Sequence, residues 1–168
     1  RAFLKVGSAG AAVFAAGSAM ANAPSGDKNN DPSRRRVLGR TGLELSVVSL
    51  GAMRTSEAAV MRACFDKGVN YIDTAYTYMG GQNERIVGEA LKGYRDKVYL
   101  ATKIDSKADL LSKQAIHASM DESLRRLGVD YVDVIQLHHP DKEIFVKDEP
   151  KEALAEIRKA GKARFVGL

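Results

Sequence analysis

Three polar side chains stand where predicted strands of this sequence end, and all three are of types that take part in proton transfer. Asp73 ends the apolar segment 69–73, Lys103 follows the segment 98–101, and His138 follows the segment 131–137. A carboxylate at the end of a buried strand is costly unless it is paired or solvated. Taken alone, Asp73 is more typical of a residue that caps the following helix. The recurrence of polar groups at later strand ends favours a shared site.

The elements that must position these side chains alternate along the chain. Two apolar pairs on either side of residues 39–42 predict a small hairpin at the start. Apolar runs that end at glycine or polar residues then predict strands at 47–51, 69–73, 98–103, 131–137 and 163–168. Helical spacing of apolar residues predicts four helices between them. These are 56–67 capped by Ser56, 84–91, 112–128 capped by Ser112, and 150–161 with Pro150 first.

Alternation of apolar strands with helices indicates a parallel sheet covered by helices. An open doubly wound sheet of the dinucleotide-binding type should have a glycine-rich turn after its first strand, and residues 51–55 lack that pattern. A closed barrel instead collects functional residues from the ends of several strands, as found here. A complete barrel takes about 250 residues. We therefore expect an α/β fold, a truncated (β/α)8 TIM barrel with roughly its first four and a half βα units and an N-terminal hairpin.

The first 21 residues have the pattern of a secretory signal peptide. A basic start with Arg1 and Lys5 precedes an Ala/Gly-rich apolar run, and small residues follow at Ala19 and Ala21. The segment resembles the second half of a twin-arginine export signal that is incomplete at its N-terminus. We expect residues 1–21 to be this signal, 22–35 a polar linker, and 36–168 the barrel. The expected partner is the export machinery and the expected location is the periplasm or outside the cell.

The composition of the 168 residues is ordinary for a globular protein, with 45% hydrophobic and 28% charged residues. The net charge of +5 is spread along the chain, so we expect no nucleic-acid partner. The apolar run at the N-terminus is too short for a membrane-spanning helix of about twenty residues, so no stable membrane insertion is expected. Cys64 is the single cysteine and lies at an apolar helical position, which predicts a buried, inert thiol and no metal site.

In order and spacing, several short motifs of residues 36–168 resemble those of the aldo-keto reductase family. They begin with Leu38-Gly39-Arg40-Thr41-Gly42-Leu43 in the predicted hairpin and with Asp73-Thr74-Ala75, where Tyr78 follows five residues after Asp73. Each motif alone is weak, and their combination is specific. The remaining matches are Asn83-Glu84 with Gly88, Thr102-Lys103, Ser123-Leu124-Arg125-Arg126-Leu127-Gly128, Asp130-Tyr131-Val132-Asp133 and His138-x-Pro140.

The resemblance implies a catalytic tetrad and an NADPH-dependent reduction of small-molecule aldehydes or ketones to alcohols. Tyr78 would give the carbonyl oxygen its proton, although a free tyrosine has a pKa near 10. The Lys103 ammonium would stabilise the phenolate, and Asp73 would hold that ammonium in place. His138 would orient the carbonyl by a hydrogen bond. Within the family pattern, Tyr76 and His139 are the weaker alternatives for the acid and the imidazole.

The resemblance also places the nicotinamide near the first strand, with Gly51, Ala52, Met53 and Asp73 as neighbours. The family's main contacts to the adenine and its phosphate lie beyond the fifth strand, so the preference for NADPH rests on the family alone. Some exported relatives have a cysteine-rich iron–sulfur tail, and residues 1–168 do not show whether this protein has one.

Two other interpretations stay open. One is a non-catalytic, reductase-like binding or regulatory protein, because the same fold serves as an ion-channel subunit in some relatives. The other is an inactive fragment. Residues 22–168 alone would leave the sheet edges unpaired. They would also leave inward-facing side chains, expected to include Tyr71 and Leu100, without partners across the barrel. We therefore expect this piece alone to aggregate and to reduce no carbonyl.

Overall fold

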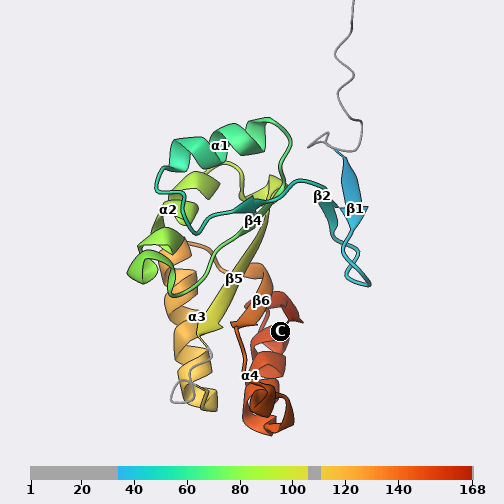
Figure 1. Cartoon of the computed structure of the whole chain (residues 1–168), viewed down its shortest axis with the longest axis vertical. Helices are drawn as coiled ribbons and strands as arrows, with labels where there is room; N and C mark the ends of the chain where they lie inside the picture. The colour runs from blue at the N-terminus through green and yellow to red at the C-terminus, as the bar shows by residue number, and fades with distance from the viewer. Residues whose placement is uncertain (1–33, 106–110, 168) are drawn as a thin grey trace, which may run out of the picture.

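Five parallel strands in the order β3-β4-β5-β6-β7 form the sheet of this protein, as seen in a computed structural model (Figure 1). The structure describes residues 34–105 and 111–167, so the predicted signal peptide and most of the predicted linker lie outside the described residues. The strands are β3 Leu50–Gly51, β4 Tyr71–Asp73, β5 Tyr99–Asp105, β6 Val132–His138 and β7 Ala163–Gly167. Strand order follows chain order, as expected for consecutive βα units of a (β/α)8 barrel. The predicted fold class is confirmed.

Within the described residues, four α-helices alternate with these strands: α1 Ala58–Asp66, α2 Gln82–Leu91, α3 Lys113–Leu127 and α4 Asp148–Lys159. Short 3-10 helices lie in some of the connections: η1 Tyr78–Gly81 precedes α2, η2 Arg95–Lys97 precedes β5, and η4 Lys142–Val146 precedes α4. The predicted cap of α3 is confirmed, because the Ser112 hydroxyl accepts a hydrogen bond from the Ala115 amide at 3.3 Å. Glycine 128 then ends the helix in a left-handed conformation, with φ of 64°.

Three local predictions were wrong. Glu57, and not Ser56, stands at the N-cap of α1, and its side chain makes no capping hydrogen bond. Pro150 is the third residue of α4 and not the first, a position in the first turn where a missing N–H still costs nothing. Cys64 is half-buried and not fully buried. The apolar positions of α1 that do reach the core are Met61 and Phe65.

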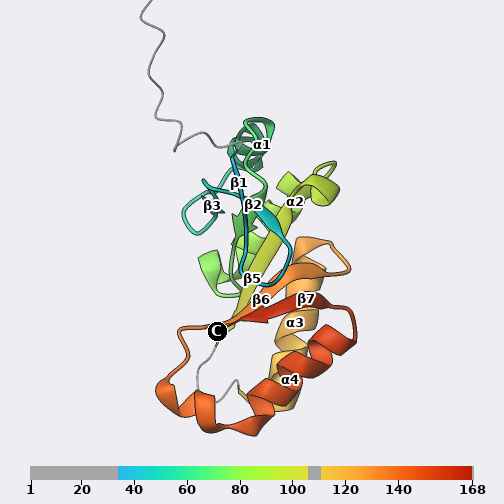
Figure 2. The same cartoon turned by 90° about the vertical axis from the view of Figure 1, so that its right-hand side faces the viewer.

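The hairpin predicted at the start is present as β1 Arg35–Val37 paired antiparallel with β2 Glu44–Ser46. Asn70, just before β4, fastens it to the sheet. The Asn70 side chain accepts from the Ser46 amide at 2.6 Å and donates to the Glu44 carbonyl at 2.9 Å. Figures 1 and 2 show the hairpin on the side of the sheet away from α2 and α3.

Successive side chains along each strand point to opposite faces of the sheet, and each face has its own hydrophobic core. The larger core lies between the sheet and the helices and contains Ile72, Leu100 and Ile135. The smaller core lies on the other face, where Leu43 and Leu45 of the hairpin segment pack with inner-face residues of the strands. Tyr71 belongs to this inner face, as predicted, whereas Leu100 does not. Leu100 faces the helices because its neighbour Ala101 occupies the inner face, and side chains alternate along a strand.

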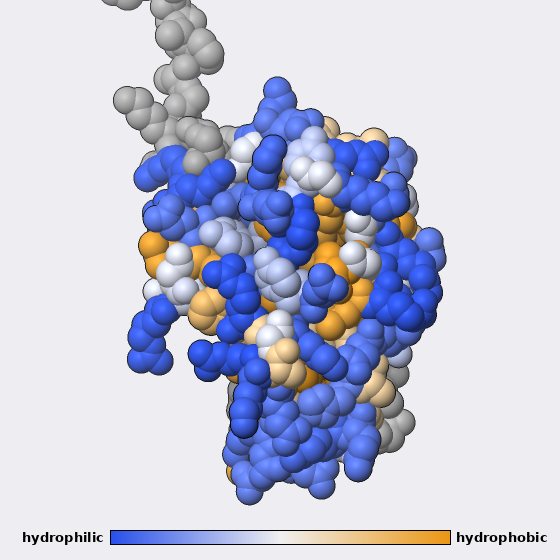
Figure 3. Space-filling model, turned by 180° about the vertical axis from the view of Figure 1, so that it is seen from behind, coloured by the Kyte–Doolittle hydropathy of each residue, from blue (hydrophilic) through white to orange (hydrophobic). Residues whose placement is uncertain are grey.

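Apolar side chains also reach the surface in the middle of the face opposite to that of Figure 1, where polar residues surround them (Figure 3). Within residues 34–105 and 111–167, no helix combines the length and the apolar character needed to cross a membrane.

Candidate active site

The structure brings Asp73, Lys103 and His138 together at the carboxyl ends of three neighbouring strands. Asp73 is the last residue of β4, Lys103 lies near the end of β5, and His138 is the last residue of β6. Asp73 pairs in register with Ala101, and His138 pairs with Asp105. Because Lys103 lies two residues from each of these partners, the three side chains share the inner face of the sheet.

The Lys103 ammonium connects the members of this cluster. Its Nζ forms an ion pair with the Asp73 carboxylate and donates to the Thr74 carbonyl at 2.9 Å. The same Nζ lies 3.5 Å from the Tyr78 hydroxyl and 5.1 Å from the centre of the Tyr78 ring. The Lys103 and Asp73 side chains are only 16% and 28% exposed, so water screens the pair weakly. A cation at this place stabilises negative charge on the Tyr78 oxygen.

Tyr78 follows β4 on a tightly wound loop. Its amide donates to the Ala75 carbonyl at 3.1 Å, and the Gly80 amide donates to the Thr77 carbonyl at 3.1 Å. Met79, Gly80 and Gly81 then have φ angles of 51°, 62° and 88°. This left-handed run turns the chain sharply into α2 and points Tyr78 back toward the strand ends.

The non-glycine residues with positive φ in the described parts of the chain are Met79 and His139. Each directly follows a residue of the predicted tetrad, Tyr78 or His138. A non-glycine residue in this conformation costs free energy and persists where the surroundings enforce it, a pattern common at functional sites.

His138 completes the cluster from β6. Its ring meets the Tyr78 ring edge to face, with centroids 5.5 Å apart and planes at 79°. The Nδ1 atom of His138 lies 3.5 Å from the Thr77 hydroxyl. The His139 ring stacks on the His138 ring, with centroids 4.6 Å apart. Burial, followed by the nearby charges of His139 and Lys103, lowers the pKa of His138 below its usual value. The imidazole is therefore neutral at neutral pH and can donate one hydrogen bond and accept another.

Tyr76, the weaker candidate for the acid, has different surroundings from Tyr78. Tyr76 packs its ring beneath the Arg126 guanidinium, 4.4 Å from ring centre to Cζ, and its carbonyl accepts from Arg126 at 3.1 Å. The tyrosine hydroxyl next to the Lys103 ammonium is that of Tyr78.

A layer of buried polar side chains lies beneath this loop and was not predicted from the sequence. The Thr74 hydroxyl donates to the Asn83 side chain at 2.6 Å, and Asn83 donates to the Ala52 carbonyl at 2.7 Å. The Thr102 hydroxyl donates to Glu84 at 2.7 Å. Asn83 and Glu84 are fully buried. The available signal was the adjacent pair of polar residues at the start of an amphipathic helix, and the family motif contained them without giving them a role.

The residues predicted to lie near a nicotinamide are at the end of β3, beside Asp73. Gly51 pairs in register with Asp73, and a Cβ at Gly51 would have no heavy atom within 4 Å. The space beside the Gly51 backbone is therefore open. Met53 is 48% exposed, whereas Ala52 is fully buried with its amide bonded to the Asp73 carbonyl and its carbonyl bonded to Asn83. Gly51 and Met53 are thus the accessible members of this group.

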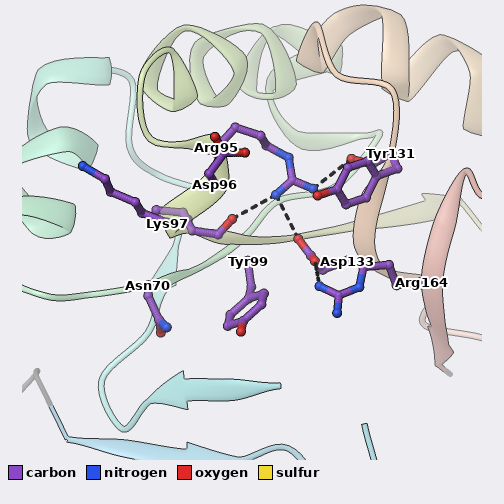
Figure 4. Close-up of a pocket in the computed structure, with 9 residues that line it drawn as sticks. Asn70, Arg95, Asp96, Lys97, Tyr99, Tyr131, Asp133 and Arg164 are labelled. Carbon is purple, nitrogen blue, oxygen red and sulfur yellow. Dashed lines mark hydrogen bonds and ion pairs between the residues drawn. The ribbon is translucent and has the colours of Figure 1, made fainter. Parts of the chain in front are cut away.

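A second polar pocket lies at the opposite end of the strands (Figure 4). Asp133 is its centre, only 1% exposed, with Arg95 at 3.0 Å on one oxygen and Arg164 at 2.8 Å on the other. Asp133 also accepts from the Leu100 amide at 2.9 Å, and Arg95 stacks on the Tyr131 ring. These contacts join β5, β6 and β7 at their amino ends, the face of a barrel that serves stability and not chemistry. In the described parts of the chain, no three His, Cys, Asp or Glu side chains are grouped as a metal site requires.

Comparison with known proteins gives one consistent family. Residues 47–168 match the aldo/keto reductase family. The chain is 37% identical over 147 residues to aldo-keto reductase YhdN of Bacillus subtilis, a match that covers 76% of this chain and 44% of that protein. It superposes on the holo form of an aldo-keto reductase from Bacillus halodurans with a TM-score of 0.72 and 34% identity, over 80% of this chain and 49% of that one.

A third match is the structure of an aldo-keto reductase from Klebsiella pneumoniae in complex with NADPH. Its TM-score is 0.67 at 34% identity, over 75% of this chain and 46% of that one. The chain spans about half the length of the curated relatives that it matches. On the match over residues 47–168, with the strand order and the cluster at the strand ends, this chain belongs to the aldo/keto reductase family.

Proposed function

We propose that the full-length protein is an NADPH-dependent oxidoreductase that reduces aldehydes or ketones to alcohols, with Tyr78 as the proton donor. The observation that carries this proposal is the position of the Lys103 ammonium, which is paired with Asp73 and lies 3.5 Å from the Tyr78 hydroxyl. The fold alone supports many reactions, whereas this arrangement suits proton donation by a phenol.

The proton transfer follows from the charges around Tyr78. As the Tyr78 hydroxyl gives its proton to the carbonyl oxygen of the substrate, negative charge develops on the phenolic oxygen. The Lys103 ammonium stabilises that charge at short range, in a setting where water screens it weakly. Asp73 and the Thr74 carbonyl hold the ammonium in place, so no reorganisation is needed as the charge forms.

Neutral His138 sets the direction from which the carbonyl approaches. Its ring edge is in contact with the Tyr78 ring, so a carbonyl oxygen next to the Tyr78 hydroxyl also comes within reach of the imidazole. A neutral imidazole with its proton on the facing nitrogen donates a hydrogen bond to that oxygen and does not compete with Tyr78 as an acid.

The cofactor supplies the hydride for the substrate carbon when it is bound. Gly51 and Met53 would lie against its nicotinamide ring, with Asp73 beside them. NADPH is proposed over NADH because the Klebsiella relative was crystallised with NADPH. A side chain at Gly51 would fill the open space beside Asp73, so Gly51→Val should weaken NADPH binding in a fluorescence titration.

The reaction type is tested by isotope transfer. Incubation of the full-length protein with a series of aldehydes and NADPH deuterated at the nicotinamide C4 should give alcohols with one deuterium on the former carbonyl carbon. Mass spectrometry and NMR of the product detect this. Tight NADPH binding with no labelled alcohol from any aldehyde or ketone would favour the non-catalytic, reductase-like binding protein instead.

We also propose that residues 1–21 direct export by the twin-arginine route, and that residues 22–168 expressed alone reduce no carbonyl. The first proposal rests on the basic, apolar and small-residue pattern of the segment. Replacement of Arg1, the one arginine of residues 1–21, by lysine should retain the precursor in the cytoplasmic fraction. Unchanged periplasmic accumulation would mean another route.

A further inference from the structure

Arg126 of α3 contacts the loop that carries Tyr78, although it lies 48 residues further along the chain. Its guanidinium stacks on the Tyr76 ring at 4.4 Å and donates to the Tyr76 carbonyl at 3.1 Å. The two contacts hold both the side chain and the backbone of Tyr76. The Tyr78 amide donates a hydrogen bond to the carbonyl of Ala75, the residue before Tyr76. The turn that carries Tyr78 is therefore anchored to the segment that Arg126 contacts.

The guanidinium also lies against the far end of the same loop. A Cβ at Gly81 would come within 2.5 Å of the Arg126 Cζ and 3.0 Å of its Nε. Glycine at this position, with φ of 88°, therefore lets the arginine pack directly on the backbone just before α2 begins. Arg126 thus touches the loop on both sides of Tyr78.

Two carboxylates fix the guanidinium itself. Glu122 accepts from Arg126 Nε at 2.8 Å, and Glu84 lies 3.4 Å from Nη1. Glu84 is fully buried and also accepts from Thr102, the neighbour of Lys103 in β5. Burial raises the pKa of Glu84, while its hydrogen bonds and the Arg126 charge act in the opposite direction. The Arg126 side chain is only 14% exposed, so it is a fixed part of the layer beneath the site.

We propose that Arg126 is a positioning residue, which fixes the loop 74–81 so that the Tyr78 hydroxyl stays next to the Lys103 ammonium. It acts through Tyr76 and Gly81 and touches neither the substrate nor the reacting atoms. Its effect on the loop stands on the contacts above, whereas its effect on turnover rests on the proposed reductase function. A displacement of about 1 Å of a reacting group can cost about a hundredfold in rate.

The test measures the loop and the turnover separately in the full-length protein. Arg126→Gln removes the charge-assisted contacts, and Arg126→Lys keeps the charge but loses the planar stacking on Tyr76. Arg125→Gln is the matched control, because Arg125 is the neighbouring residue, is 61% exposed and also binds Glu122. The first readout is amide hydrogen exchange of residues 74–82, with the hairpin and β6 as internal references.

We expect Arg126→Gln to speed exchange in residues 74–82 by at least about tenfold, the effect of losing one charge-assisted hydrogen bond. Exchange in the hairpin and β6 should stay as in the wild type, and Arg125→Gln should change neither region. We expect kcat to fall by roughly ten- to a hundredfold in Arg126→Gln, with Arg126→Lys between it and the wild type, and with an unchanged Kd for NADPH.

Unchanged exchange in residues 74–82 would overturn the proposal. A uniform rise over the whole protein in both Arg126 variants would also overturn it, because Arg126 would then stabilise the fold and not the loop. If the loop alone is loosened but the wild type reduces no carbonyl, the positioning role stands and the proposed reductase function fails.

Discussion

Replacement of Gly88 by alanine tests the contact between α2 and α3 on which the buried layer depends. Gly88 lies in the middle of α2, where a glycine costs about 1 kcal/mol relative to alanine. A Cβ there would overlap the carbonyl oxygen of Leu127 and lie 2.8 Å from its carbonyl carbon. Leu127 is the last residue of α3, so the obstacle is helix backbone that cannot rotate away.

The two effects oppose each other, and the structure decides which is larger. Alanine gains about 1 kcal/mol in helix propensity. Overpacking typically costs about 1–3 kcal/mol, and a backbone obstacle that cannot move places this site in the upper part of that range, at about 2–3 kcal/mol. We expect a net loss of about 1–2 kcal/mol. In the full-length protein Tm should fall by a few degrees, because the shift is about 2–4 °C per kcal/mol for 150–250 residues and smaller for longer chains.

Thermal unfolding followed by circular dichroism measures this loss. Gly51→Ala is the matched control, because its Cβ would enter open space and its φ is not positive. Its unfolding free energy should stay within about 0.5 kcal/mol of the wild type. A Gly88→Ala protein as stable as the wild type, or more stable, would refute the close approach of α2 to α3.

Two further changes have outcomes that the structure predicts. His139→Asn suits the left-handed backbone and removes one of the charges that lower the pKa of His138, so that pKa should rise in an NMR titration. In the wild type, the stabilising effect of neutral His138 is complete above pH 6.5 and is lost as the pH falls through the lowered pKa. Asp133→Ala leaves two arginines without their buried carboxylate and should cost about 3 kcal/mol in urea unfolding, whereas exposed Asp96→Ala should cost little.

The positions of the site residues followed from the sequence because they depend on strand ends. Each apolar run ends at a residue whose type is unsuited to burial, and parallel strands bring those ends to one edge of the sheet. The hairpin and the start of α3 were predictable for a similar reason, since both are encoded by a few adjacent residues such as Ser112.

Features that depend on packing between distant segments were not predictable. Arg126 and Glu84 meet only because α2 and α3 lie side by side, and nothing near either residue in the sequence indicates the other. The direction of Leu100 was missed because an apolar run that is buried on both faces has no alternation to read. The start of α1 was misplaced because Ser56 and Glu57 both precede the apolar pattern, and the backbone, not the residue type, decides which becomes the cap.

The central claim is that Tyr78 donates the proton, and the most direct test is the turnover of Tyr78→Phe in the full-length protein. This change removes the hydroxyl beside Lys103 and leaves the ring that packs against His138. We predict that kcat/KM for carbonyl reduction falls by about 10²–10⁴-fold, while the Kd for NADPH measured by fluorescence titration is unchanged. Carbonyl reduction by Tyr78→Phe at close to the wild-type rate would contradict the assignment.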